Sequence, residues 1–128
     1  MSFALAAGAA PIAVFAAGFV WVLGRLTAPG CEVTERASIP SPDGRHRAVV
    51  FSRDCGATTG FSTQLALLGA ADRLSIGSDA ALVVDGRHEL DVRWTADRSV
   101  AVAVPKGDRV YRRAASQSDV TILYRDAD

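Results

Sequence analysis

Residues 33–51 read VTERASIPSPDGRHRAVVF and contain two strand-like patterns on either side of a turn. Polar and apolar residues alternate from Val33 to Ile39, as expected for a strand with one buried face. The run PSPDG at 40–44 places proline where a turn starts and glycine where it closes. Residues 45–53 resume the strand pattern and include the apolar run AVVF. This stretch predicts a β-hairpin and indicates that the chain builds a β domain.

Alternating patterns separated by turn signals continue toward the C-terminus. The further predicted strands cover residues 61–68, 80–84, 87–95, 100–104, 110–111 and 120–124. Asp85-Gly86 is a strong signal for a two-residue hairpin turn, so we expect the strands on either side of it to pair. We predict a small all-β domain of about seven strands, arranged as an antiparallel meander that forms a sandwich or a curled sheet.

The first part of the chain has a different composition. Residues 2–24 carry no charged side chain, whereas the remainder carries all 14 basic and all 14 acidic residues. About 22 apolar residues in a helix span about 33 Å, which matches the hydrocarbon thickness of a bilayer. We therefore predict one N-terminal transmembrane helix as an anchor over residues 1–26, a linker over 27–32 and an extracytoplasmic β domain over 33–128.

Trp21 and Arg25 stand near the end of the apolar segment, where we expect them at the membrane interface. Two alternatives to a permanent anchor remain open. A cleaved secretory signal normally has a basic amino-terminal region and a shorter apolar core, and this segment has neither. A lipoprotein would carry its lipid on Cys31, although residues 28–30 imitate the required attachment motif only loosely.

Two features of the sequence disagree about orientation. Arg25 and Arg36 follow the predicted span while no basic residue precedes it, which favours a cytoplasmic β domain. Cys31 and Cys55 are the two cysteines of the chain. An isolated pair in a small domain favours a disulfide and therefore an extracytoplasmic compartment. We give precedence to the cysteines and predict the Cys31–Cys55 bond.

The most unusual stretch is RDCGATTGFSTQ at residues 53–64, where two glycines frame small polar residues between hydrophobic strands. Together with the SPDG and AVVF runs of the first hairpin, it resembles an uncharacterised family of small bacterial envelope proteins that are exported or membrane-tethered. The resemblance covers roughly residues 31–68, and more loosely 92–94 and 122–124. It implies an exported β domain. Together with the predicted anchor and the cysteine pair, it leads us to expect a single-span protein of the bacterial inner membrane with a periplasmic C-terminal domain. It implies no activity.

This stretch supplies our candidate contact loop, which consists of Asp54, Thr58, Thr59, Phe61, Ser62 and Gln64. The structural alternative is that Gly56 and Gly60 permit left-handed turns while the polar residues satisfy the loop backbone. Cys55 with His46 or His88 would supply the ingredients of a thiol nucleophile, but a disulfide consumes the thiol. The cysteines and histidines also lack metal-ligand spacing. We expect no catalytic, cofactor or metal site.

Charge and size narrow the function further. Zero net charge without a basic run argues against nucleic-acid binding. A polar body of about 104 residues has room for one modest core, which excludes a large multidomain enzyme. We expect a non-enzymatic accessory or scaffolding subunit of a larger membrane complex, with the membrane and other membrane-protein subunits as partners. The alternative is a free-standing envelope module that binds a soluble ligand or another protein.

Overall fold

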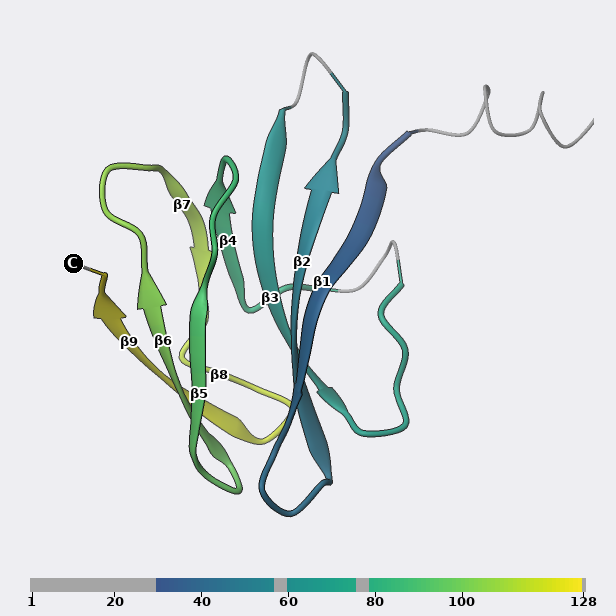
Figure 1. Cartoon of the computed structure of the whole chain (residues 1–128), viewed down its shortest axis with the longest axis vertical. Helices are drawn as coiled ribbons and strands as arrows, with labels where there is room; N and C mark the ends of the chain where they lie inside the picture. The colour runs from purple at the N-terminus through teal and green to yellow at the C-terminus, as the bar shows by residue number, and fades with distance from the viewer. Residues whose placement is uncertain (1–29, 57–59, 76–78, 128) are drawn as a thin grey trace, which may run out of the picture. The chain divides into compact units, whose positions relative to one another are not determined.

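The computed structural model describes residues 30–56, 60–75 and 79–127, whose strands are shown in Figure 1. The predicted anchor, residues 27–29 of the predicted linker and the proposed interface residues Trp21 and Arg25 lie outside these described residues. Within the described part of the chain, no helix is long and apolar enough to cross a membrane.

The described residues form nine strands in two sheets, which confirms the small all-β domain. Sheet A has the order β1-β2-β3-β4-β7, and sheet B has the order β5-β6-β9-β8. The short strand β8 was not indicated by the alternation pattern. The strands are β1 (Glu32–Pro40), β2 (His46–Asp54), β3 (Phe61–Gly69), β4 (Leu82–Asp85), β5 (Asp91–Ala96), β6 (Ser99–Val104), β7 (Val110–Arg113), β8 (Ser116–Gln117) and β9 (Val120–Asp126).

The predicted first hairpin is present as the antiparallel pair β1 and β2, with Ile39 opposite Ala48. Its turn is closed by the Gly44 amide, which donates to the Ser41 carbonyl oxygen at 2.9 Å. Gly44 has a φ of 72°, a left-handed conformation that glycine adopts without steric cost. The Ser41 hydroxyl also donates to Asp43 Oδ1 at 2.7 Å. Ser41, Asp43 and Gly44 of the SPDG run therefore each have a definite task in the turn.

The main core lies between the two sheets, because its buried residues come from both. Sheet A contributes inward-facing residues of β2, β3 and β4, and sheet B contributes inward-facing residues of β5, β6 and β9. Its buried members are Ala48, Val50, Leu65, Leu67, Ala81, Leu82, Val84, Val92, Val100, Val102, Val104, Val120 and Ile122.

The opposite face of sheet A is covered as well. Phe51 and Ala66, which point away from sheet B, form a second cluster with Val49 and Ala80. Leu74 and Ala80 belong to the connection between β3 and β4, so this connection lies against the outer face of the sheet. We call Val49, Phe51, Ala66, Leu74 and Ala80 the outer cluster. As a result, the middle residues of β2 and β3 are buried on both faces.

The prediction of a hairpin at Asp85-Gly86 is wrong. Strand β4 pairs with β3 and β7, whereas β5 pairs with β6 in the other sheet. The Gly86 amide donates to the Phe61 carbonyl oxygen at 2.8 Å, which continues the pairing with β3 beyond the end of β4. Residues 86–90 then cross from sheet A to sheet B. Tertiary pairing with β3 has overridden the local turn signal.

The prediction of an antiparallel meander is also wrong for sheet B, because β6 and β9 run parallel, with Val100 opposite Ile122. Between them the chain crosses to sheet A as β7 and returns as β8. The tight turn from β8 to β9 uses Ser118 and Asp119 at φ values of 52° and 64°. This pair of left-handed residues is the backbone pattern of a two-residue hairpin turn, here without the usual glycine.

Candidate functional site

The candidate contact loop connects β2 to β3 at the end of sheet A that carries the disulfide. Asp54 Oδ1 accepts a hydrogen bond from the Gly56 amide at 3.0 Å. The Gly60 amide donates to the Gly56 carbonyl oxygen at 3.0 Å, and both glycines have left-handed φ values. The glycines therefore serve the turn, as the structural interpretation expected. Thr58 and Thr59 lie outside the described residues.

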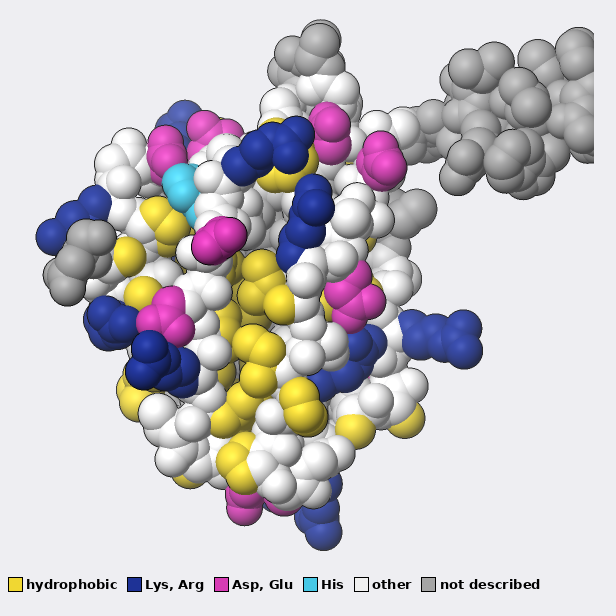
Figure 2. Space-filling model, viewed as in Figure 1, with side chains coloured by type: hydrophobic (Ala, Val, Ile, Leu, Met, Phe, Trp, Pro, Cys, Tyr) yellow, Lys and Arg dark blue, Asp and Glu magenta, His cyan; other side chains and the backbone are white. Residues whose placement is uncertain are grey.

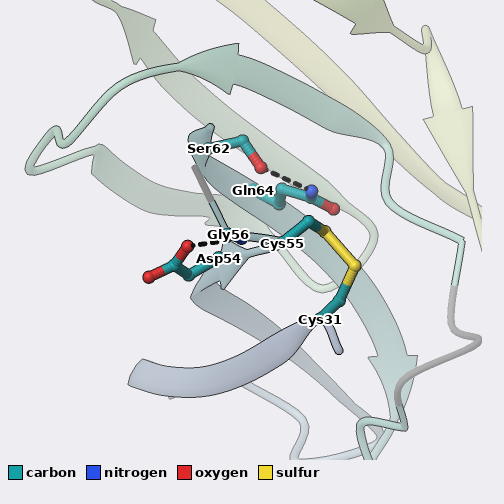
Figure 3. Close-up of a disulfide and its surroundings, with 6 residues drawn as sticks. All are labelled: Cys31, Asp54, Cys55, Gly56, Ser62 and Gln64. Carbon is teal, nitrogen blue, oxygen red and sulfur yellow. Dashed lines mark hydrogen bonds between the residues drawn. A yellow bond between two sulfur atoms is a disulfide. The ribbon is translucent and has the colours of Figure 1, made fainter. Parts of the chain in front are cut away.

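The other members of the loop are divided between the two faces of sheet A. Asp54 pairs with Phe61 and faces the side of sheet B, whereas Ser62 and Gln64 face the opposite side. In Figure 3, Ser62 and Gln64 lie toward the disulfide, and the Asp54 carboxylate points away from it. Gln64 is 5% exposed, and its amide nitrogen donates to Ser62 Oγ at 2.8 Å. These residues do not share one surface.

The disulfide predicted from the sequence is present between Cys31 and Cys55 (Figure 3). Their Cα atoms are 4.0 Å apart. The two residues flank the last pairing of β1 with β2, in which Glu32 lies opposite Asp54. The bond therefore closes the hairpin at the end where the chain continues to residues 1–30. It also removes Cys55 as a free thiol, so the proposed nucleophile ingredients with His46 or His88 do not assemble in this state.

Sequence reasoning missed a groove of about 530 Å³ beside Phe61. Its floor is the inward face of β1, β2 and β3, and its other wall is the crossing segment 86–90. In Figure 2 a hydrophobic strip is visible in this hollow, with basic side chains beside its upper end. The lining residues are Arg36, Ala37, Ile39, Val50, Ser52, Phe61, Thr63, Arg87, His88, Glu89 and Leu90. A volume of this size lies in the range of about 300–1,000 Å³ that is typical of small-molecule sites.

Thr63 holds the crossing segment against the groove. Its hydroxyl donates to the Gly86 carbonyl oxygen at 2.8 Å and accepts from the His88 amide at 3.0 Å. The His88 ring adds a second attachment, because Nε2 lies 2.8 Å from both the Asp85 carbonyl oxygen and Asp108 Oδ2. Both partners are acceptors, so the geometry assigns a proton to Nε2. The wall of the groove is thus fixed at both its backbone and its side chains.

Two arginines of the groove are ordered by neutral neighbours. Arg36 Nε donates to Ser52 Oγ at 3.3 Å. Arg87 stacks on Phe61, with Cζ 4.0 Å from the ring centroid, an arrangement favoured by attraction between a cation and the face of an aromatic ring. Within the described residues, neither guanidinium forms an ion pair with a carboxylate. The groove therefore presents two positive groups with N–H donors to spare.

Within the described part of the chain, no group of three or more histidine, cysteine, aspartate or glutamate side chains is placed to hold a metal. Outside the groove, the Ser41 hydroxyl lowers the pKa of Asp43, and burial raises the pKa of Tyr124. Tyr124 OH donates to the Ala114 carbonyl oxygen at 2.7 Å, which gives it a structural task.

The chain matches no family model, no curated protein and no solved structure. Functional reasoning therefore depends on the residues themselves. Among the groove residues, only Phe61 was singled out as a contact residue from the sequence. A signal for part of the rest exists, since His88 and Leu90 continue the alternation of Val92 and Trp94 and so fall on the inward side of the chain.

Proposed function

We propose that this chain is a non-enzymatic, single-span protein of the bacterial inner membrane whose periplasmic β domain serves as an accessory or scaffolding subunit of a larger membrane complex. The uncharged, apolar segment 2–24 supports the membrane span. It contains no ionisable residue that would serve transport, which supports a scaffolding role. The Cys31–Cys55 bond supports the periplasmic side, because disulfides persist in oxidising compartments.

The observation that carries the contact role is the stack of Arg87 on Phe61. Arginine and aromatic side chains are enriched at protein interfaces, where they dominate the binding energy. Phe61 belongs to neither hydrophobic cluster, so it is available without loss of the fold. The stack also lies at the disulfide end of sheet A, because Phe61 pairs with Asp54, the neighbour of Cys55.

The orientation is tested by fusing a reporter that is active only in the cytoplasm after Asp128. We expect no reporter activity, and we expect activity from a matched reporter that works only in the periplasm. The reverse pair of results would overturn the periplasmic assignment.

The scaffolding role is tested by purifying the tagged full chain from its native membrane in mild detergent and identifying co-eluting proteins by mass spectrometry. We expect the Phe61→Ala/Arg87→Ala variant to lose its partners at least tenfold relative to wild type. The matched control removes another arginine–aromatic pair, the exposed Arg109 and Tyr111 at β7 of sheet A. Equal partner recovery from all three proteins would overturn the contact role of the stack, and recovery of no partner from wild type would overturn the scaffold.

The groove favours a second candidate function, a free-standing envelope module that binds a ligand. A small-molecule site is typically an apolar hollow with a few fixed polar groups, and the groove has that character. The two candidates differ in a simple observable: the module binds its ligand as a purified chain, whereas the scaffold requires other subunits.

A further inference from the structure

The groove changes in polarity along its length. The strand register places Ile39 toward one end, Ala37 opposite Val50 in the middle, and Ser52 opposite Thr63 followed by Phe61 toward the other end. The crossing segment repeats this order, with Leu90 on the way to β5 and Arg87 beside Phe61. One end of the groove is therefore hydrocarbon, and the other carries hydroxyl groups and charges.

The polar end has a net positive charge that suits a single negative charge. Arg36, Arg87 and Glu89 are its charged lining residues apart from His88, which already faces Asp108. Among the described residues, Arg36 bonds through Nε to Ser52, and the stack on Phe61 engages the face of the Arg87 guanidinium rather than its edge N–H groups. A planar fork of N–H donors matches the two oxygens of a carboxylate.

The apolar end excludes a broad occupant. The indole N–H of Trp94 donates to the Ile39 carbonyl oxygen at 2.9 Å, so a side chain of β5 already spans the gap to β1. An extended peptide that added to the free edge of β5 would need the space that this bridge occupies. Val50 and Ser52 form the floor yet are only 5% and 4% exposed, which indicates a narrow groove. A single hydrocarbon chain fits these limits better than a pleated strand.

From these observations we propose that the groove binds a monocarboxylate with one acyl chain. The carboxylate lies between Arg36 and Arg87, and the hydrocarbon chain runs over Val50 between Ile39 and Leu90 and ends near Trp94. This proposal rests on the binding-module candidate and names its ligand class. It shares Arg87 with the proposed scaffolding contact, and the two are distinguished by whether the purified chain alone binds the ligand.

The full chain with Trp21→Phe, reconstituted in phosphatidylcholine nanodiscs, tests the proposal, because Trp94 is then its single tryptophan. Bromine quenches tryptophan fluorescence on close approach. We expect saturable quenching by 12-bromododecanoate and much weaker quenching by 2-bromododecanoate, since only the first carries bromine at the chain end. In an unbrominated competition series, each added methylene should tighten binding about threefold to fourfold until the groove is full.

Two variants and a control separate recognition from partitioning into the nanodisc. Arg36→Gln/Arg87→Gln removes both charges, and we expect binding of the acid to weaken about tenfold or more. Arg98→Gln removes an exposed arginine that does not line the groove, and it should change nothing. Ala37→Phe fills the groove from an exposed position of β1 and should abolish saturable quenching while both arginines remain.

The proposal is overturned if wild type shows no saturable quenching, if both bromine positions quench equally, or if the double arginine variant binds the acid as tightly as wild type does. Native mass spectrometry of the full chain from its own membrane adds an independent reading. An adduct with the mass of an acyl monocarboxylate supports the proposal, and a polypeptide adduct in the groove overturns it. Because the quenching experiment uses the purified chain alone, its failure leaves the co-purification result standing, and the converse also holds.

Discussion

Sheet A and sheet B bury their faces differently. The central strands of sheet A are covered on both sides, by the main core on one face and by the outer cluster on the other. In sheet B, β9 alternates between buried Val120 and Ile122 and exposed Thr121 and Leu123. The centre of sheet A is therefore covered on both faces, and sheet B provides the cover on one of them. The groove lies over parts of β1 and β2 that sheet B leaves uncovered.

The largest expected effect on stability comes from removing the Phe51 side chain from the outer cluster. Phe51→Ala should lower the free energy of unfolding by about 3–5 kcal/mol, because Phe51 is 2% exposed and its removal leaves a cavity. Leu123→Ala, at a 53% exposed position on the outer face of sheet B, should stay within about 0.5 kcal/mol of wild type. Urea unfolding followed by tryptophan fluorescence gives both values. Equal losses of unfolding free energy in the two variants would contradict this difference between the outer faces of sheets A and B.

The disulfide is expected to have the next largest effect, because it fixes the edge strand of sheet A. Cys31→Ser/Cys55→Ser should cost about 3–4 kcal/mol, since the bond joins residues 24 positions apart and restricts the unfolded chain. Intact mass before and after reduction should differ by about two hydrogen masses if the bond has formed. Two thiols that alkylate freely in the native protein would contradict the assignment.

A smaller effect tests how sheet B is attached to sheet A. Gln117 Oε1 accepts from the Leu67 amide at 2.7 Å, and Gln117 Nε2 donates to the Asp79 carbonyl oxygen at 2.9 Å. Gln117→Ala should cost about 1–3 kcal/mol, because the Leu67 amide loses its partner. Hydrogen exchange should accelerate at Leu67 in particular. Ser116→Ala, one residue earlier and exposed, is the control and should leave that amide protected.

The smallest effect concerns the turn of the first hairpin. The hydrogen bond from Ser41, followed by that from the Arg45 amide, lowers the pKa of Asp43 below its ordinary value of 3.8. The folded state therefore favours the ionised carboxylate, so its stabilisation is present above about pH 4 and is lost as the pH falls below that value. Urea midpoints at pH 5, 4 and 3 should show a slightly steeper decline for wild type than for Asp43→Asn. Parallel declines would contradict the role of this carboxylate.

The first three strands are predictable because their signals are local. Proline and glycine at 40–44 mark the turn, and alternation sets the boundaries of β1. The Cys31–Cys55 pairing follows from having only two cysteines in the chain. The left-handed conformations of Gly56 and Gly60 follow from their places in a loop between two strands.

The later part of the chain is less predictable because nonlocal pairing determines it. The residues around Asp85 and Gly86 contain no signal for the hydrogen bond from the Gly86 amide to the Phe61 carbonyl oxygen. The residues around β6 likewise contain no signal for its parallel pairing with β9. The groove shares this difficulty: Arg36 and Arg87 are 51 positions apart, and only the pairing of β1, β2 and β3 brings them to one hollow.

The position of β9 has a consequence for biogenesis. This strand is the last element of the described chain, yet it lies inside sheet B between β6 and β8 rather than at an edge. A nascent chain therefore cannot complete sheet B until the residues of β9 have been synthesised, and β6 keeps one row of backbone groups unpaired until then. A chain truncated before β9 would therefore leave the valine-rich strand β6 unpaired along one edge and exposed to aggregation.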